Sequence, residues 1–224
     1  QNQRSSTTNA FVTLNETHDI LARYGFDEAA GNYQATNYTG LGLPGDALLV
    51  DVDDPDLICN ASVMFIPSPS LVADVDGQDV NMELNFCNFT VPGRDSGMDN
   101  DIVIHEFGHA VLARLIGGPM WMQGSIANSQ IGAMHEGSGD FLALIVGMEA
   151  TDDPGDAKWD TDWYTGNEAK GVRRQAYSYD QAISGRTFED WNAEDDPSTT
   201  IPNTEVHQAG EIWASVLYDM TWEL

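Results

Sequence analysis

Basic residues are scarce in this sequence, and their scarcity restricts its partners. Of 224 residues only 9 are Lys or Arg, against 36 Asp or Glu, so the formal net charge is −27. Lys158 and Lys170 are the only lysines. A surface this acidic repels nucleic-acid phosphates and anionic lipid headgroups. We therefore expect neither nucleic acid nor a membrane as a partner.

Long apolar runs are missing as well, since no stretch is long enough to span a bilayer. The chain starts at Gln1 without a Met or a basic-then-apolar leader, which is typical of a processed product. With 224 residues and 42% hydrophobic residues, a folded globular protein of one large domain or two lobes is expected.

Cysteine is limited to Cys59 and Cys87. A single pair is typical of an extracellular disulfide, and two buried free thiols are the alternative. Four Asn-x-Ser/Thr sequons are present, at Asn15, Asn37, Asn60 and Asn88. They carry glycans only if a eukaryote secretes the chain.

The apolar pattern predicts a β-rich N-terminal half with one helix. Residues 9–24 place apolar side chains, among them Phe11 and Leu14, at helical spacing. Strands are indicated by "ALLVDV", "SVMFIPS" and "VNMELNFCNFTV". The last alternates apolar and polar residues, and we expect residues 80–89 to form the edge strand that pairs with an extended substrate.

The second half reads as mainly helical. Helices are predicted in "DNDIVIHEFGHAVLARLIGGP", "MHEGSGDFLALIVGMEA" and "VHQAGEIWASVLYDMTWEL", with Asp-, Pro- and Gly-rich loops over residues 151–205. The fold class is therefore α+β, with a β-rich lobe over residues 1–98 and a helical lobe over residues 99–224.

The stretch "IHEFGHA" carries a metal-binding pattern. His105 and His109 stand four residues apart, so on a helix they share a face and can hold one ion. Their imidazoles suit Zn²⁺. Glu106 lies about 100° round the helix, off the metal but close to a water bound to it, whose proton it can take. This is the HExxH arrangement of zinc metalloproteases.

A catalytic zinc site needs a third protein ligand and an open position. Glu136 in "HEGSGDF" is the candidate, with His135 as a rival. Asp140 follows Glu136 on the same helix face and suits a supporting role, accepting the N–H of a ligand histidine. The alternative for Glu136 and Asp140 is that both are surface acids of a very acidic protein.

Several segments in order resemble the fungalysin family: "NETHDILARYGFDEAAGNYQ", the zinc-helix segment, "HEGSGDF", "VRRQAYSYD" and "VHQAGEIWASVLYDM". The resemblance implies a secreted endopeptidase with a two-lobed thermolysin-like (gluzincin) fold and the zinc helix at the cleft. It implies His105, His109 and Glu136 as zinc ligands, Glu106 as the general base acting on a zinc-bound water, and a propeptide removed before activity.

The same resemblance assigns further roles. His207, in a Val-His-x-x-Gly context, would donate a hydrogen bond to the oxyanion, although a helix-capping histidine is the alternative. Arg173 or Arg174 would hold the substrate carbonyl beyond the scissile bond, with Tyr177 nearby. A salt bridge within an acidic protein explains either arginine equally well.

Two other functions compete with the endopeptidase. Zinc aminopeptidases also use HExxH with a distant Glu, but "SGMDND", the one echo of their amine-binding motif, lies only five residues before His105. A catalytically silent binding module would tend to have lost a ligand or the base, and none is lost here.

Aspartate clusters suggest calcium as a second ion, although none has EF-hand spacing. The clusters are Asp51, Asp53, Asp54 and Asp56; Asp74, Asp76 and Asp79; and Asp152, Asp153 and Asp156. The last helix carries an apolar stripe that includes Trp213 and Met220 up to the final residue. We expect a downstream fragment of the same protein to cover it.

Overall fold

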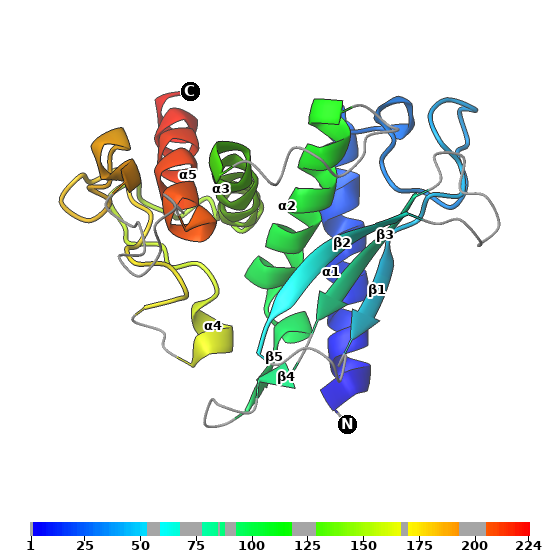
Figure 1. Ribbon diagram of the computed structural model, residues 1–224, viewed down its shortest axis with the longest axis horizontal. Helices are drawn as coiled ribbons and strands as arrows, with labels where there is room; N and C mark the ends of the chain where they lie inside the picture. The colour runs from blue at the N-terminus through cyan, green and yellow to red at the C-terminus, as the bar shows by residue number, and fades with distance from the viewer. Residues whose placement is uncertain are drawn as a thin grey trace. The chain divides into compact units, whose positions relative to one another are not determined.

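The computed structural model describes residues 2–52, 59–67, 78–84, 86–87, 93–117, 129–166, 170–192 and 205–224. Its helices and short sheets confirm the α+β class. The chain forms two compact units, Gln1–Gln123 and Gly124–Leu224, called here the N-terminal and C-terminal units. The elements of each unit are drawn in Figure 1.

The N-terminal unit is built from two long helices and a small sheet. In chain order its elements are α1 (Asn2–Arg23), η1 (Glu28–Ala30), β1 (Leu49–Val52), β2 (Ala61–Pro67), β3 (Gln78–Leu84), β4 (Phe86–Cys87), β5 (Arg94–Asp95), η2 (Ser96–Met98) and α2 (Asn100–Gly117). The strand order is β1-β3-β2, with β1 parallel and β2 antiparallel to β3. Met82 and Leu84 of β3 are fully buried, so the sheet contributes the apolar core of this unit.

The position of β3 shows that the expected edge strand is wrong for residues 81–84, which pair on both sides. Met82 pairs with Val50 on one side and with Val63 on the other, so β3 is the central strand. Its backbone groups are already used by neighbours and are not available to an added substrate strand. Residues 86 and 87 pair instead with β5.

Helix α1 buries a different face from the one its apolar residues predicted. Phe11 is 67% exposed, whereas Ser6, Ala10, Thr13 and Thr17 are buried. The buried hydroxyls have partners: Ser6 donates to Asp95 at 2.7 Å, and Thr13 donates to Asn100 at 3.0 Å. Small residues let α1 approach its neighbours closely, and the hydrogen bonds offset the cost of burying their oxygens.

Helix α2 is held by a loop that precedes the sheet. The Tyr33 hydroxyl donates to the Ala110 carbonyl at 2.8 Å, and its ring lies against Phe107. The Arg114 guanidinium lies over the Tyr33 ring, 4.4 Å from its centre, and 3.3 Å from the Asp46 carboxylate. Both charged side chains are buried, so the pair fixes the loop onto α2.

Because α2 packs on α1 and on the sheet, it belongs to the N-terminal unit. The expected lobe boundary between residues 98 and 99 differs from this division. The sequence changed from strand to helix character at that point, but burial of the almost wholly apolar α2 requires the elements before it.

Cys59 is disulfide-bonded, as the cysteine count predicted. It directly precedes β2, and the only other cysteine, Cys87, lies in β4. A bridge of this kind restricts the unfolded chain and is typical of extracellular proteins.

The C-terminal unit is organised around two helices, α3 (Ser129–Val146) and α5 (Val206–Glu223). Between them come α4 (Asp162–Thr165), η3 (Phe188–Asn192) and loops joined by the bridge between Lys158 and Tyr177. Figure 1 shows α3 and α5 side by side. Tyr177, Ala214 and Tyr218 form the buried cluster beneath them, with Leu144 and Trp222 packed against it.

Across the described ranges, no helix combines the length and the apolar character needed to cross a bilayer.

The pair of Asp46 and Arg114 should contribute strongly to stability. Asp46→Ala should lower the free energy of unfolding by about 3 kcal/mol, because the buried guanidinium loses a carboxylate partner. Urea unfolding followed by tryptophan fluorescence measures this. Asp19→Ala, at a side chain 74% exposed on α1, is the control and should change it by less than about 0.5 kcal/mol. Equal effects of the two substitutions would contradict the role of the pair.

Candidate metal centre and active site

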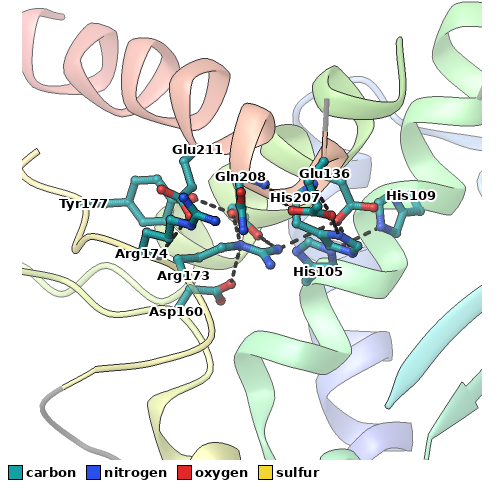
Figure 2. A network of polar contacts seen from close by, with 12 residues as sticks. His105, His109, Glu136, Asp160, Arg173, Arg174, Tyr177, His207, Gln208 and Glu211 are labelled. Carbon is teal, nitrogen blue, oxygen red and sulfur yellow. Dashed lines mark hydrogen bonds and ion pairs between the residues drawn. The ribbon is translucent and has the colours of Figure 1, made fainter. Parts of the chain in front are cut away.

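Helix α2 brings the two motif histidines together. The Nε2 atoms of His105 and His109 are 3.1 Å apart, and their rings meet edge to face. Two nitrogens at about 2.0–2.1 Å from a tetrahedral zinc would be about 3.3 Å apart. The side chains of this helix therefore fit a shared zinc ion, and Figure 2 shows both rings projecting from it.

Helix α2 begins as the sequence predicted. The Asp99 carboxylate accepts the Asp101 N–H at 3.1 Å, and the Asp99 carbonyl accepts the first helical hydrogen bond from Val103. This cap fixes where the helix begins, and therefore the helix face on which His105 and His109 lie. Glu106 follows His105 on this helix, rotated about 100° from it.

In the C-terminal unit, Glu136 of α3 and His207 of α5 lie close together. The His207 Nε2 is 3.4 Å from a Glu136 carboxylate oxygen. This proximity depends on two glycines at the helix contact. A Cβ on Gly137 would lie 2.3 Å from the Gly210 carbonyl, and one on Gly210 would lie 2.7 Å from the Glu136 Cβ. Only glycine at both positions allows so close an approach.

Glu205 orients the His207 ring and caps its helix. Its carboxylate lies 2.5 Å from the His207 Nδ1 and accepts the backbone N–H groups of His207 and Gln208. The hydrogen bond to Glu205 raises the pKa of His207. Burial by itself would raise the pKa of Glu205, but the hydrogen bonds from His207 and Gln208 lower it to about 2. Glu205, and not His207, is therefore the cap.

A buried ion pair holds Arg173. Its Nε and Nη2 atoms donate to the two oxygens of Asp140 at 2.7 and 2.6 Å, and Tyr177 donates its hydroxyl to the same carboxylate. Burial would lower the pKa of Arg173, but the Asp140 charge outweighs it and the pKa is raised well above its usual value. The carboxylates of Asp160 and Glu136 each lie 3.8 Å from this guanidinium.

These contacts decide between some of the alternatives. The salt-bridge explanation is confirmed for Arg173, and a substrate contact by the same residue stays a prediction. Tyr177 has no exposed surface and its hydroxyl is bound to Asp140, and its place near the substrate stays a prediction. The side chain of Arg174 is exposed.

The remaining site predictions involve both units. His105, Glu106 and His109 belong to the N-terminal unit, and Glu136 and Asp140 to the C-terminal unit. The ligand set of His105, His109 and Glu136, and the support of a ligand histidine by Asp140, therefore stay predictions.

Three buried or half-buried carboxylates of this region were not found from the sequence: Glu205, Asp160 and Glu211. Signals for two of them existed. Glu205 directly precedes the predicted helix, where a side chain can cap it. Glu211 stands one turn after His207 within an otherwise apolar stretch, which marks a carboxylate that needs a partner. Asp160 lies in a loop without a local pattern.

The calcium prediction is not tested. Asp53, Asp54, Asp56, Asp74 and Asp76 lie outside the described residues. Within the third cluster, Asp152 is engaged by the Lys158 amine at 2.6 Å, and Asp153 accepts the Gly155 N–H at 2.9 Å.

The two histidines of α2 fit a shared metal ion, an arrangement typical of HExxH metallopeptidases. The family model described as fungalysin metallopeptidase (M36) matches residues 1–224, and the chain belongs to this family.

Three fungal proteins are among those similar to this chain. It is 33% identical over 223 residues to the extracellular metalloproteinase MEP of Pyricularia oryzae, covering 98% of this chain and 32% of that protein. It is 34% identical to the extracellular metalloproteinase 4 of Trichophyton soudanense, covering 98% and 51%. It is also 34% identical to the extracellular metalloproteinase mep of Aspergillus terreus, covering 98% and 32%. The chain thus spans about a third to a half of the length of these relatives.

The glycine contact between α3 and α5 should not tolerate a methyl group. Gly210→Ala should lower the free energy of unfolding by about 2 kcal/mol, since the new Cβ would meet the Glu136 Cβ and the backbone of Gly137. The gain in helix propensity, about 0.5–1 kcal/mol, is smaller.

Chemical unfolding of Gly210→Ala beside Gly155→Ala measures this effect. An added Cβ at Gly155 meets only the end of the Asp153 side chain, at 3.3 Å, so the control should unfold like the unchanged protein. A Gly210→Ala protein as stable as its control would show that the helices do not need the close contact.

Proposed function

We propose that this chain is the core of a secreted zinc endopeptidase that hydrolyses internal peptide bonds. The convergence of the His105 and His109 Nε2 atoms, 3.1 Å apart on one helix face, is the observation that carries the proposal. Glu136 is proposed as the third ligand from its place in "HEGSGDF". The two-lobed thermolysin-like arrangement, with the zinc helix at the cleft, is part of the proposal.

Zinc, when bound by these residues, would polarise the scissile carbonyl and make a water nucleophilic near neutral pH. Glu106 would take a proton from the attacking water on its carboxylate and pass it to the leaving amine. Its position next to His105 keeps the carboxylate beside the ligand face without using it as a ligand.

His207 would donate a hydrogen bond to the oxygen of the scissile carbonyl as negative charge develops there. Its neighbours support this role. The contact of Nδ1 with Glu205 fixes the ring, and Nε2 faces the carboxylate of Glu136, the proposed third ligand, at 3.4 Å. The raised pKa of His207 favours the protonated, donating form.

Arg173 would hold the substrate carbonyl beyond the scissile bond. The Asp140 carboxylate accepts two of the five N–H donors of the Arg173 guanidinium and so holds this planar group in one orientation. Arg174, with an exposed side chain, is the second candidate for this contact. Tyr177 supports Arg173 through Asp140.

Secretion is proposed from two observations. The similar fungal proteins are named extracellular metalloproteinases. Cys59 is in a disulfide, which persists in oxidising compartments. The family resemblance implies in addition a propeptide that is removed before activity.

A zinc aminopeptidase and a silent binding module are the alternatives that the first experiment separates. Cleavage of an internally quenched peptide with both ends blocked requires an endopeptidase, because an aminopeptidase needs a free amine. Activity that appears only after the N-terminal block is removed would contradict the endopeptidase, and no cleavage of either peptide by the zinc-loaded protein would favour a silent module.

Glu106→Gln should keep stoichiometric zinc and lose activity by about a hundredfold or more, because the base is removed while the ligands remain. Zinc content by atomic absorption and cleavage of the blocked peptide measure the two properties. Glu16→Gln, an exposed acid on α1, is the matched control and should keep both. Turnover by Glu106→Gln at the unchanged rate would refute the proposed mechanism.

We further propose that a downstream segment of the same protein covers α5. Val216, Met220 and Leu224 recur every four residues and are 47%, 55% and 105% exposed, so they form an apolar strip along one side of this helix. The similar proteins are two to three times as long as the matched region, so they contain chain to supply such a cover.

Exposed apolar side chains of this size forgo roughly 1.5–3 kcal/mol each. A protein extended beyond Leu224 by the native continuation should therefore unfold at a higher denaturant concentration than the 224-residue chain. In the extended protein, Met220→Lys should remove most of the gain, whereas in the 224-residue chain it should have little effect. Equal effects in both proteins would refute the cover.

A further inference from the structure

A buried carboxylate of the C-terminal unit has no role in the chemistry proposed above. Glu211 lies on α5 with no exposed surface. Figure 2 shows it projecting from α5 toward Arg174. One oxygen accepts the Arg174 backbone N–H at 2.9 Å, and the other lies 3.6 Å from the Arg186 Nε.

These contacts fix the backbone on one side of Arg173. The other side is fixed as well, because the Val172 N–H donates to the Asp160 carbonyl at 3.3 Å. The chain there is packed so closely that a Cβ on Gly171 would lie 1.7 Å from the same carbonyl oxygen. Arg173 thus stands between two backbone anchors, and its Cα has little room to move.

Glu211 also connects this segment to His207. The two residues are four positions apart on α5, so they stand one above the other on the same helix face. A single side chain therefore joins the helix that carries His207 to the segment that carries Arg173.

We propose that Glu211 is a positioning residue: by accepting the Arg174 N–H it sets the placement of the Arg173 guanidinium relative to His207. The inference rests on the proposed function, in which Arg173 and His207 contact one substrate on two sides of the scissile bond. The rate of cleavage should depend on the distance between these two groups, because a small misplacement of the bound substrate lowers the rate by a large factor.

The length of the Glu211 side chain matters more for this role than its charge. Burial raises the pKa of this carboxyl, with smaller opposing effects from the Arg174 N–H and the charge of Arg186. Gln has the same length and keeps a carbonyl oxygen that can accept the Arg174 N–H. Asp keeps the charge but is one methylene shorter, so its oxygens do not reach the same place.

The experiment compares Glu211→Gln and Glu211→Asp in the zinc-loaded, active protein. Glu211→Gln should keep kcat/KM for the blocked peptide within about threefold, and Glu211→Asp should lower it about tenfold or more. Both should keep the unchanged zinc content. Asp219→Asn, which removes a carboxylate two turns further along α5, is the control and should leave kcat/KM unchanged.

A double-mutant cycle separates positioning from a general loss of structure. If Glu211 acts through Arg173, the loss caused by Glu211→Asp should largely disappear in a protein that already carries Arg173→Lys. Losses that multiply would show that Glu211 does not act through Arg173. Unchanged kcat/KM in Glu211→Asp would overturn the proposal outright.

A second measurement does not depend on activity, so it keeps the proposal separate from the proposed function. In ¹⁵N spectra the Arg173 Nε–H, bonded to Asp140 and buried, should exchange slowly with water. Its exchange should accelerate in Glu211→Asp and stay slow in Glu211→Gln and in Asp219→Asn. Equal exchange in all of these proteins would refute the positioning role even in a protein that cleaves no peptide.

Discussion

The ion pair between Arg173 and Asp140 is the constraint on which the C-terminal unit depends. Both side chains are buried, and two parallel hydrogen bonds of 2.6 and 2.7 Å join them. Either charge left alone at this depth would cost several kcal/mol, so the two positions can only be occupied together. Because Asp140 stands one turn after Glu136 on α3, the pair also ties the helix of the proposed ligand to the segment of the proposed substrate contact.

Three of the nine basic residues of this acidic chain are held in its interior. Arg114 faces Asp46, Arg173 faces Asp140, and Arg186 faces Glu211, in each case at a side chain that is at most 13% exposed. Six basic residues remain outside these pairs, against 36 acidic residues in the chain. Each pair fixes the segment that carries its arginine, because a charge buried without a partner would be costly.

Much of the fold follows from the periodicity of apolar residues. Where the prediction and the structure differ, the difference has a physical cause. The helices α2 and α5 and the strands β1 and β2 lie where the sequence pattern placed them, and α3 begins five residues before its expected segment, at Ser129 and not Met134. Helix α1 buries a face of small residues and not the face that its apolar spacing predicted. The hydroxyls on this face form hydrogen bonds with Asp95 and Asn100, which lowers the free-energy cost of burying them. Strand β3 is central because β1 and β2 both pair with it. The alternation of apolar and polar residues within one strand does not say which strands will pair.

The relative placement of the motif residues could be predicted from the local sequence. His105, Glu106 and His109 are local neighbours, and the geometry of an α-helix fixes their relation whatever else the chain does. Other contacts follow from the packing of the C-terminal unit: Arg173 is held by Asp140, Tyr177 is wholly buried, and Glu211 anchors the Arg174 backbone. These partners lie 33 to 37 residues apart, and their contact depends on how α3, α5 and the intervening loops pack, which no local pattern encodes.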